Sequence, residues 1–370
     1  MKLARLGDVC EIIMGQAPPG ETYNLDGQGL PLIAGASDFG KVSPDPSRFT
    51  TAASKTSKVG DIVLCIRATI GNLNWSDKEY CLGGGVAGVR AKTHLAVPSY
   101  IWWALDFSNE SLNMLGKGAT FLQISRADIE TLEIPLPPLD EQRRIAAILD
   151  QADTLRGKRR EAMLQLSQLG HAIFNQMFPF GSMKRKPLLE MIEIQSGLVD
   201  PKKDEYADLP HIGPEHIQKG TGELLPFRTA REDAVTSGKF LFDETCVLYS
   251  KIRPNLNKVA LAVGRGLCSA DMYAVRPKEM QSTREYIWFL LRTADFLVHA
   301  SGFSNRANIP KLNKEQVLSY LAPAPTFDEM LEFSKRIDTL QKLRSLGQDH
   351  LNQLEGSFAS LQHRAFRGEL

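Results

Sequence analysis

Residues 135–178, "PLPPLDEQRRIAAILDQADTLRGKRREAMLQLSQLGHAIFNQMF", join a proline-rich corner to a long helical pattern. The prolines fix their own φ angles and favour extended neighbours, so a helix cannot begin before them. We expect Asp140 to be the N-cap, with Glu141 in the first turn beside the helix dipole. A helix from Asp140 to Phe178 would be about 58 Å long at 1.5 Å per residue.

Apolar residues recur along this stretch in alternating steps of three and four, which is typical of the a and d positions of a coiled coil. They are Ile145, Ile148, Ala152, Leu155, Ala162, Leu166, Leu169 and Ile173. A second pattern of this kind, between residues 327 and 366, contains Phe333, Ile337, Leu340, Leu351, Leu354, Phe358 and Leu361. Two such helices can bury their stripes against each other, so we expect an antiparallel pair.

The chain also contains an internal repeat. "SYIWWAL" at residues 99–105 returns 186 positions later as "EYIWFLL", and this spacing also pairs Arg67 with Arg253 and Arg90 with Arg276. The proline corner returns after 188 positions, as "PAPTFDE" at residues 323–329. These spacings predict a tandem duplication of a globular unit followed by a long helix.

The repeat divides the chain into four predicted segments, in which two globular domains alternate with two long helices. Their boundaries are 1–138, 139–182, 183–325 and 326–370. Strands are expected at 30–34, 61–66, 86–89, 247–252 and 272–275, and helices at 6–13, 100–115 and 284–300. Strands and helices do not alternate strictly, which favours the α+β class over a doubly wound sheet.

Composition limits the class of protein further. Hydrophobic residues make up 43% of the chain, and no apolar run is long enough to span a membrane. The start "MKLARLGDVCEII" has charges where a signal peptide needs its apolar core, so we expect a cytoplasmic protein. The five cysteines form no CxxC pair, which argues against a metal site and favours reduced, mostly buried thiols. The net charge of +1 means that any basic surface is local.

The order of these parts resembles the specificity subunit of type I restriction-modification systems. The strongest match is "IPLPPLDEQRRIAAILDQAD" at residues 134–153, and "AFRGEL" at 365–370 resembles the end of that family's last helix. The resemblance spans essentially the whole chain. The second copy departs from it, because "APAPTFDEMLEFSKRID" lacks the Glu-Gln pair and the following Arg-Arg-Ile.

The resemblance implies a fold and a set of partners. It implies two repeated target recognition domains separated by two long antiparallel helices, each domain recognising one half of a split sequence in double-stranded DNA. Two modification (methyltransferase) subunits, which carry S-adenosylmethionine, would dock along the helices, and restriction subunits would join for cleavage. A helix longer than one DNA turn of about 34 Å could place two recognition domains on successive turns.

Candidate DNA contacts lie in loops at matching places of the two copies, where Arg, Asn and Gln can bond base edges and Ser, Thr and Lys can reach phosphates. In copy one they are Arg67, Thr69, Asn72, Asn74, Lys117, Thr120, Gln123, Ser125 and Arg126. In copy two they are Lys251, Arg253, Asn255, Asn257, Lys258, Ser304, Asn305, Arg306, Asn308 and Lys311. Each of these residues taken singly could equally make a structural ion pair or hydrogen bond.

The first long helix offers polar candidates for partner binding. They are Glu141, Gln142, Arg143, Arg144, Arg159 and Arg160, although arginines on a helix are ordinarily a solvated face. Residues 1–138 carry 12 Lys and Arg against 14 Asp and Glu, and residues 183–324 carry 20 against 17. We therefore expect weak, salt-sensitive DNA binding by the isolated chain.

Two other classes stay open at this point. The sequence has no methyltransferase-like Asp-Pro-Pro-Tyr segment and no nuclease-like cluster of carboxylates and lysine, so we expect a non-catalytic subunit without a cofactor of its own. A divergent DNA methyltransferase or nuclease is one alternative. A helical scaffold that joins proteins without recognising DNA is the other.

Overall fold

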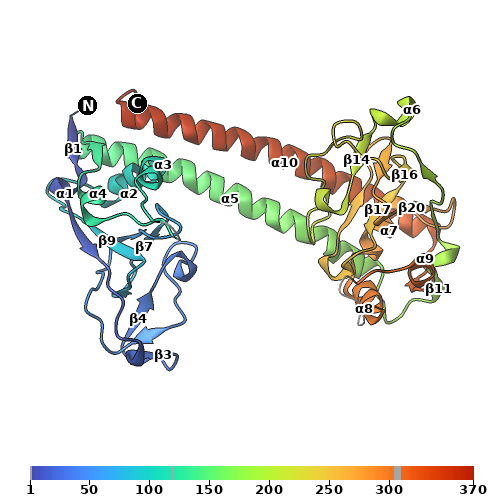
Figure 1. Cartoon of the computed structure of the whole chain (residues 1–370), viewed down its shortest axis with the longest axis horizontal. Coiled ribbons are helices and arrows are strands. Elements are labelled where there is room, and N and C mark those ends of the chain that lie inside the picture. The colour runs from blue at the N-terminus through green and yellow to red at the C-terminus, as the bar shows by residue number, and fades with distance from the viewer. Residues whose placement is uncertain (1, 119–120, 304–309) are drawn as a thin grey trace. The chain divides into compact units, whose positions relative to one another are not determined.

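The structure, a computed structural model, describes residues 2–118, 121–303 and 310–370. Residues 1–159 and 350–370 form one compact unit (unit 1), and residues 160–349 form another (unit 2). Each unit holds a globular segment and parts of two long helices, α5 (Leu139–Met177) and α10 (Phe327–Arg367), whose course along the chain is shown in Figure 1. The predicted α+β class with two long helices is confirmed.

Unit 1 is built on an antiparallel sheet in the order β2-β9-β6-β7. Its strands are β2 (Cys10–Met14), β9 (Val86–Ala91), β6 (Ile62–Cys65) and β7 (Leu73–Trp75). A second sheet in the order β3-β5-β4-β8 holds β3 (Tyr23–Asn24), β5 (Phe49–Thr50), β4 (Leu30–Ile33) and β8 (Cys81–Leu82). β1 (Leu3–Arg5) pairs with β10 (Glu133–Pro135). This last pair brings the start of the globular segment next to its end.

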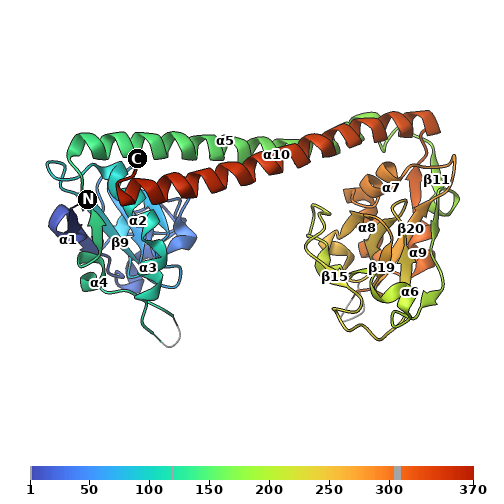
Figure 2. The same cartoon turned by 90° about the horizontal axis from the view of Figure 1, so that it is seen from above.

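Short helices and both long helices close the core of unit 1. The short ones are α1 (Leu6–Val9), α2 (Pro98–Phe107), α3 (Asn109–Met114) and α4 (Arg126–Glu130). Tyr100 of α2 is buried with Leu149 of α5 and Phe366 of α10 in one hydrophobic cluster. Figure 2 shows α2 beside the C-terminal part of α10. The core is thus assembled from segments far apart in the sequence.

Unit 2 repeats this plan with the sheet β12-β20-β17-β18. Its strands are β12 (Ile192–Ile194), β20 (Met272–Pro277), β17 (Val247–Ser250) and β18 (Val259–Leu261). The second sheet, β13-β16-β19-β14-β15, holds β13 (Leu198–Val199), β16 (Lys239–Phe242), β19 (Gly266–Cys268), β14 (Pro210–Ile212) and β15 (Arg228–Thr229). β11 (Arg185–Pro187) pairs with β21 (Leu321–Pro323), as β1 does with β10.

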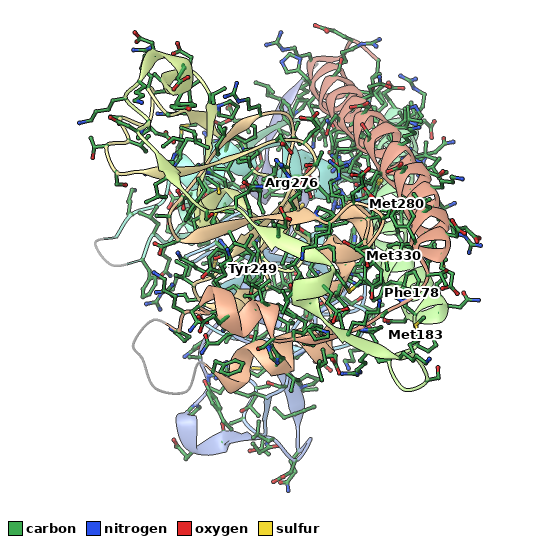
Figure 3. All side chains as sticks on the ribbon, turned by 90° about the vertical axis from the view of Figure 1, so that its right-hand side faces the viewer. Phe178, Met183, Tyr249, Arg276, Met280 and Met330 are labelled. Atoms are coloured by element: carbon green, nitrogen blue, oxygen red, sulfur yellow. The ribbon has the colours of Figure 1, made fainter. Side chains whose placement is uncertain are left out.

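The helices of unit 2 also correspond to those of unit 1. They are α6 (Asp204–Ala207), α7 (Arg284–Leu290), α8 (Ala294–Gly302) and α9 (Lys314–Leu318). Phe178, which directly follows α5, and Met330 of α10 lie in its core with Tyr249 of β17 (Figure 3). The single helices expected at residues 100–115 and 284–300 are each broken into two, α2 with α3 and α7 with α8.

Equivalent hydrogen bonds confirm the duplication. The hydroxyl of Tyr100 donates to the carbonyl of Pro135 at 2.7 Å, and the hydroxyl of Tyr286 donates to the carbonyl of Pro323 at 2.6 Å. In both copies the buried tyrosine therefore holds the proline corner that leads into a long helix. All five cysteines are buried and free, and no helix in the described ranges is both long and apolar enough to cross a membrane.

Within each unit the two long helices run antiparallel. In unit 1, Arg144 donates to the carbonyl of Leu370 at 2.8 Å, and Arg156 lies 3.1 Å from Glu355. Residue numbers therefore increase along α5 in the direction in which they decrease along α10. In unit 2, the rings of Phe174 and Phe178 lie 5.4 Å and 5.3 Å from the ring of Phe333. The apolar stripe predicted on α10 is confirmed, because all of its members are buried or half-buried.

The stripe predicted on α5 is partly wrong. Ile145 is buried, but Leu155 is 50% exposed, and Ala162 and Leu169 are exposed as well. The buried positions of α5 are Gln142, Ile145, Ala146 and Leu149 in unit 1 and Gly170 and Phe174 in unit 2, and Phe178 is buried directly after the helix ends. These residues face the globular core as well as α10, so packing against that core decides which face of the helix is buried.

The start of α5 differs from expectation too. The helix begins at Leu139, directly after Pro138, so Asp140 lies inside the first turn and is not the N-cap. Proline suits the position before the helix because the first N–H groups have no helical partner. α10 has a side-chain cap instead: Glu329 accepts from the backbone N–H of Thr326 at 2.8 Å, and Thr326 Oγ1 accepts from Glu329 N–H at 3.3 Å.

Gln142, proposed above as a partner contact, is a core residue with 1% of its surface exposed. Its Oε1 accepts from the N–H of Val97 at 2.9 Å. Its Nε2 donates to the carbonyls of Leu95 at 3.1 Å and Pro137 at 2.9 Å. The amide therefore ties the loop before α2 to the first turn of α5, and Gln142 is removed from the candidate partner surface.

Replacing Gln142 by alanine should lower the free energy of unfolding by about 2–3 kcal/mol, because three buried backbone groups lose their partner. Urea denaturation of the full chain measures this change. Arg143→Ala is the matched control on the next residue, since Arg143 is 59% exposed and pairs with Asp140 on the surface. It should change the unfolding free energy by less than about 1 kcal/mol. Equal effects of the two substitutions would contradict this role of Gln142.

His171 of α5 makes the stability of unit 2 depend on pH. Its ring lies edge-on to Phe289 at 5.0 Å, and burial, together with the charge of Arg292, lowers the pKa of His171 to about 4. Unfolded histidine has a pKa of about 6.5, so between these values the unfolded chain binds more protons than the folded chain. Stability should therefore fall as the pH drops from 6.5 towards 4.

His171→Phe should remove about 1 kcal/mol of the stability loss between pH 7 and pH 5. The measurement is urea denaturation of wild type and variant at both values. Identical pH dependence in the two proteins would show that His171 does not contribute it.

Candidate nucleic-acid interface

In unit 1 the structure brings the two predicted loops together. The chain leaving β6 at residues 66–72 lies beside residues 117–118 and 121–123. Ala68 N–H donates to the carbonyl of Leu122 at 2.9 Å, and Lys117 and Gln123 exchange both backbone hydrogen bonds, at 3.0 Å and 2.9 Å. Segments fifty positions apart therefore form one surface at the end of β6.

Unit 2 has the same arrangement. The chain leaving β17 at residues 251–258 lies beside residues 310–312. Arg253 N–H donates to the carbonyl of Pro310 at 2.8 Å, and Leu312 N–H donates to the carbonyl of Lys251 at 2.9 Å. The described residues of both predicted loop pairs thus lie side by side, at corresponding places of the repeat.

The correspondence of Arg67 with Arg253, however, is wrong by one residue. Arg67 forms a bridge with Gln123, and the residue that does so in unit 2 is Ile252, with Lys311. β6 and β17 correspond at a spacing of 185, because Ile62 pairs with Val89 as Val247 pairs with Val275. The spacing of 186 holds only from β9 onward. Arg253 is therefore the counterpart of Ala68.

These two counterparts share an unusual backbone. Ala68 has φ of 64° and Arg253 has φ of 47°, in the left-handed region that side chains other than glycine rarely adopt. Such a conformation costs on the order of 1 kcal/mol or more and persists only where the surrounding hydrogen bonds impose it. Here the imposed turn points the chain back towards the second loop in both copies.

Most candidate side chains of unit 1 are exposed. These are Arg67, Thr69, Asn72, Lys117, Gln123, Ser125 and Arg126. Asn74 is 3% exposed and its amide donates to the carbonyl of Gly40 at 3.2 Å, so it lies in the core and cannot present its side chain to a ligand. Ser125 caps α4 in a capping box with Asp128, and Arg126 pairs with Glu130 at 3.2 Å. Thr120 lies outside the described residues.

The candidates of unit 2 divide in the same way. Arg253, Asn255 and Lys311 are exposed. Asn257 and Lys258 are half-buried and hold the loop in place, since Asn257 donates to the carbonyl of Arg292 at 3.1 Å and Lys258 to that of Pro214 at 2.6 Å. Ser304, Asn305, Arg306 and Asn308 lie outside the described residues.

Lys251 is half-buried against aromatic rings. Its Nζ lies 5.0 Å from the ring of Tyr273, and burial, with the nearby charge of Lys311, lowers the pKa of Lys251. Lys311 itself lies 3.3 Å from Asp271. The described residues of the unit 2 loop pair therefore include four cations, Lys251, Arg253, Lys258 and Lys311, with Asp271 beside them.

Phe121 was missed by the sequence reasoning. It is 55% exposed, and the guanidinium of Arg67 lies 5.5 Å from its ring. An exposed aromatic ring beside a cation can stack on a nucleic-acid base. The signal available in the sequence was an aromatic residue in the polar run "GKGATFLQISR".

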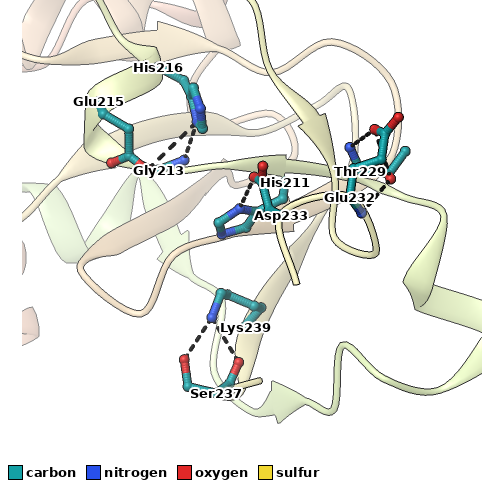
Figure 4. A network of polar contacts seen from close by, with 9 residues as sticks. All are labelled: His211, Gly213, Glu215, His216, Thr229, Glu232, Asp233, Ser237 and Lys239. Carbon is teal, nitrogen blue, oxygen red and sulfur yellow. Dashed lines mark hydrogen bonds and ion pairs between the residues drawn. The ribbon is translucent and has the colours of Figure 1, made fainter. Parts of the chain in front are cut away.

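A polar cluster in unit 2 bears on the enzyme alternative (Figure 4). His211 Nδ1 lies 2.9 Å from Asp233, His216 accepts from the N–H of Gly213 at 3.0 Å, and Lys239 donates to the carbonyl of Ser237 at 2.8 Å. Each bond ties a turn to the sheet that contains β14, β15 and β16. We interpret the cluster as structural.

Of the remaining partner candidates, Arg143 and Arg144 are exposed and pair with Asp140 and Glu141 at 2.6 Å and 2.7 Å. Arg159 contacts His350 of α10 at 3.0 Å, and Arg160 is exposed. A charged surface on the first turns of α5 therefore remains after Gln142 is removed.

Comparisons with known proteins agree with this architecture. A family model described as the type I restriction modification DNA specificity domain matches residues 1–164. A putative type I restriction enzyme MjaX specificity subunit of Methanocaldococcus jannaschii is 34% identical over 165 residues, which are 45% of this chain and 39% of that protein. The type I restriction enzyme EcoDI specificity subunit of Escherichia coli is 28% identical over 376 aligned positions, covering 87% of this chain and 82% of that protein.

A solved structure extends the likeness to the fold. The S subunit of a type I restriction-modification system from M. genitalium matches with a TM-score of 0.62 and 15% identity, over 99% of this chain and 96% of that one. At this identity the likeness concerns the fold alone. Residues 1–164 therefore match the family of type I restriction modification DNA specificity domains, and over most of its length the chain is similar to DNA specificity subunits of type I restriction-modification systems.

Proposed function

We propose that each globular segment recognises one half of a bipartite sequence in double-stranded DNA through its loop pair. The observation that carries this proposal is the construction of one polar loop pair twice, on the same strand and at corresponding places of a duplicated scaffold. Loops of unlike sequence on one scaffold would recognise unlike half-sites. Among the described residues, the DNA contacts of unit 1 would come from Arg67 and Phe121. Those of unit 2 would come from Arg253, Asn255 and Lys311.

The chemistry of these side chains suits both base and backbone contacts. Arg253 can bond guanine in two places, Asn255 can do the same with adenine, and Lys311 can reach a phosphate. In unit 1 the pair of Arg67 and Phe121 offers a cation and a flat ring together. The family resemblance and the exposure of these groups support this assignment.

We further propose that the long helices set the distance between the half-sites and dock two modification subunits. α5 has 39 residues, a rise of about 58 Å, which exceeds one DNA turn of about 34 Å. Glu141, Arg143, Arg144, Arg159 and Arg160 are the candidates for that contact. Methyl transfer from S-adenosylmethionine would take place in the partner, restriction subunits would join the same assembly, and the complex would act in the cytoplasm.

The recognition segments are proposed to be residues 1–138 and 183–325. Pairing of β1 with β10 and of β11 with β21 brings the two ends of each segment side by side. A segment whose ends are adjacent can be exchanged for a homologous one with little disturbance of the rest. This gives a direct test of the proposed division of labour.

Replacing residues 2–138 by those of a related specificity subunit should change one half of the methylated motif and leave the other half and the gap unchanged. The measurement is a genome-wide map of methylated adenines after co-expression with the modification subunit. An unchanged motif would favour a scaffold that does not recognise DNA. A change in both halves would contradict the assignment of one half to each segment.

Arg253→Gly should weaken binding of the assembled complex to its DNA target roughly tenfold to a hundredfold, because one base contact is worth about 1–3 kcal/mol. Glycine adopts the left-handed backbone without strain, so the substitution removes the side chain while keeping the turn. Ala68→Gly is the matched control, since it makes the same backbone change at the counterpart position in unit 1 and removes only a methyl group.

Ala68→Gly should leave the affinity within about twofold. Affinity is measured by fluorescence anisotropy at a fixed salt concentration, because phosphate contacts make it salt-dependent. Wild-type affinity of the Arg253→Gly complex would remove Arg253 from the interface.

A further inference from the structure

Unit 2 contains a cavity of about 330 Å³ between α5, α7, α10 and the turn at Gly220. Its walls are mostly apolar and include Leu166, Gly170, Trp288, Phe289, Ile337 and Leu340. A volume of this size suits a small ligand with an aromatic ring. A purely apolar cavity would need no further explanation, but this one also contains charge.

Arg292 lies in the wall of the cavity and is 7% exposed. Its guanidinium lies 4.6 Å from the ring of Trp288 and donates to the carbonyl of Gly220 at 2.8 Å. Its Nε has no hydrogen-bond partner among the described residues. Burial and the like charge of Arg344 lower the pKa of Arg292 to about 10. A buried cation therefore lies in the wall of the cavity.

Arg344 is the second cation of the cavity wall, with its side chain 32% exposed. The acid beside it is Glu223, at 3.5 Å and itself 54% exposed. An ion pair of that kind on the surface compensates a charge only weakly. Two guanidiniums thus share one wall, and neither has a buried carboxylate as partner among the described residues.

The equivalent place in unit 1 is filled. Because helix residues correspond at a spacing of 188, Arg156 of α5 is the counterpart of Arg344. Arg156 lies 3.1 Å from Glu355 and 3.7 Å from Asp153, and its guanidinium lies 3.9 Å from the ring of Phe358. Asp106 of α2 also interacts with Arg156 by charge. One cation is surrounded here by three acids and a phenyl ring.

Unit 2 lacks all four of these groups. Asp106 is replaced by Arg292, Asp153 by Gln341, Glu355 by Ser167 and Phe358 by Gly170. Each replacement residue lines the cavity. The ring of Phe289 lies where a side chain of residue 170 would stand, 2.7 Å from the position of a Cβ, so the cavity lies beside that ring. Its charge is what remains when three carboxylates are lost and one guanidinium is gained.

We propose that this cavity binds a small aromatic carboxylate, with the ring against the apolar walls and the carboxylate between Arg292 and Arg344. A carboxylate can accept two hydrogen bonds from a guanidinium, and its charge would be balanced by the two arginines. The apolar walls match the ring. This inference rests on unit 2 alone and does not depend on DNA recognition.

The test uses the full chain with 3-phenylpropanoate as the probe and the neutral 3-phenylpropanamide as its control of equal shape. The carboxylate should raise the melting temperature of the chain, since a ligand that binds the folded state stabilises it, and calorimetry should show the amide binding at least roughly tenfold more weakly. Equal affinity of the two probes, or no binding of the carboxylate at millimolar concentration, would overturn the proposal.

Two variants test the position of the site. Ser167→Glu supplies the acid that Glu355 provides in unit 1, so it should raise the melting temperature without ligand and abolish carboxylate binding. Arg344→Gln should weaken carboxylate binding at least roughly tenfold and bring it close to amide binding. Arg156→Gln, the matched control in unit 1, should leave binding unchanged. Unaltered binding in both unit 2 variants, or loss of binding in Arg156→Gln, would place the ligand elsewhere and refute the assignment.

Discussion

Each globular core of this protein is completed by the ends of both long helices, and the rest of the structure depends on that packing. In unit 1, Leu149 of α5 and Phe366 of α10 are buried around Tyr100. In unit 2, Phe178 at the end of α5 and Phe333 of α10 are buried with Tyr286, Phe178 being the first residue after the helix. Burying one such aromatic side chain stabilises by about 2–3 kcal/mol. Residues 1–138 and 183–325 therefore lack part of their core when the helices are absent.

The packing also explains how each helix is entered. Tyr100 and Tyr286 touch the aromatic ends Phe366 and Phe178, with ring centroids 5.5 Å and 5.1 Å apart, and donate their hydroxyls to the carbonyls of the proline corners. One side chain thus positions the start of one helix and the end of the other. Because Phe366 lies far from Tyr100 in the sequence, unit 1 can complete its core only after the whole chain is available.

The shared scaffold carries two sets of differences. One set lies in the loop pairs, where Ala68 of one copy corresponds to Arg253 of the other on an almost identical backbone. The other set lies where the helices meet α2 or α7, with Asp106 and Phe358 in one copy and Arg292 and Gly170 in the other. Both sets change chemistry without changing the fold, because the backbone is held by strand pairing and buried aromatic rings that the copies share.

The sequence predicted the large features because they rest on local periodicity and on repetition. The two long helices and the duplication follow from patterns that the chain displays without any tertiary contact, and so do the paired loops as regions. Its failures share one cause. Gln142 is polar, as expected of a surface contact, but it is buried. Asp140 is of a type common at N-caps but lies inside the helix. Asn74 is of a type that can contact a base, but it packs against Gly40.

Residue type and spacing by themselves therefore determined the two long helices, the repeat and the resemblance to type I DNA specificity subunits. The tertiary structure alone decided which face of α5 is buried, which residues of the two loops correspond, and where a cavity with unpaired charge lies. The physical reason is that burial and hydrogen-bond partners come from segments distant in the chain. The spacing between the two copies changes by one residue between β6 and β9, so the counterpart of Arg253 is Ala68 and not Arg67. Local composition gives no sign of this change.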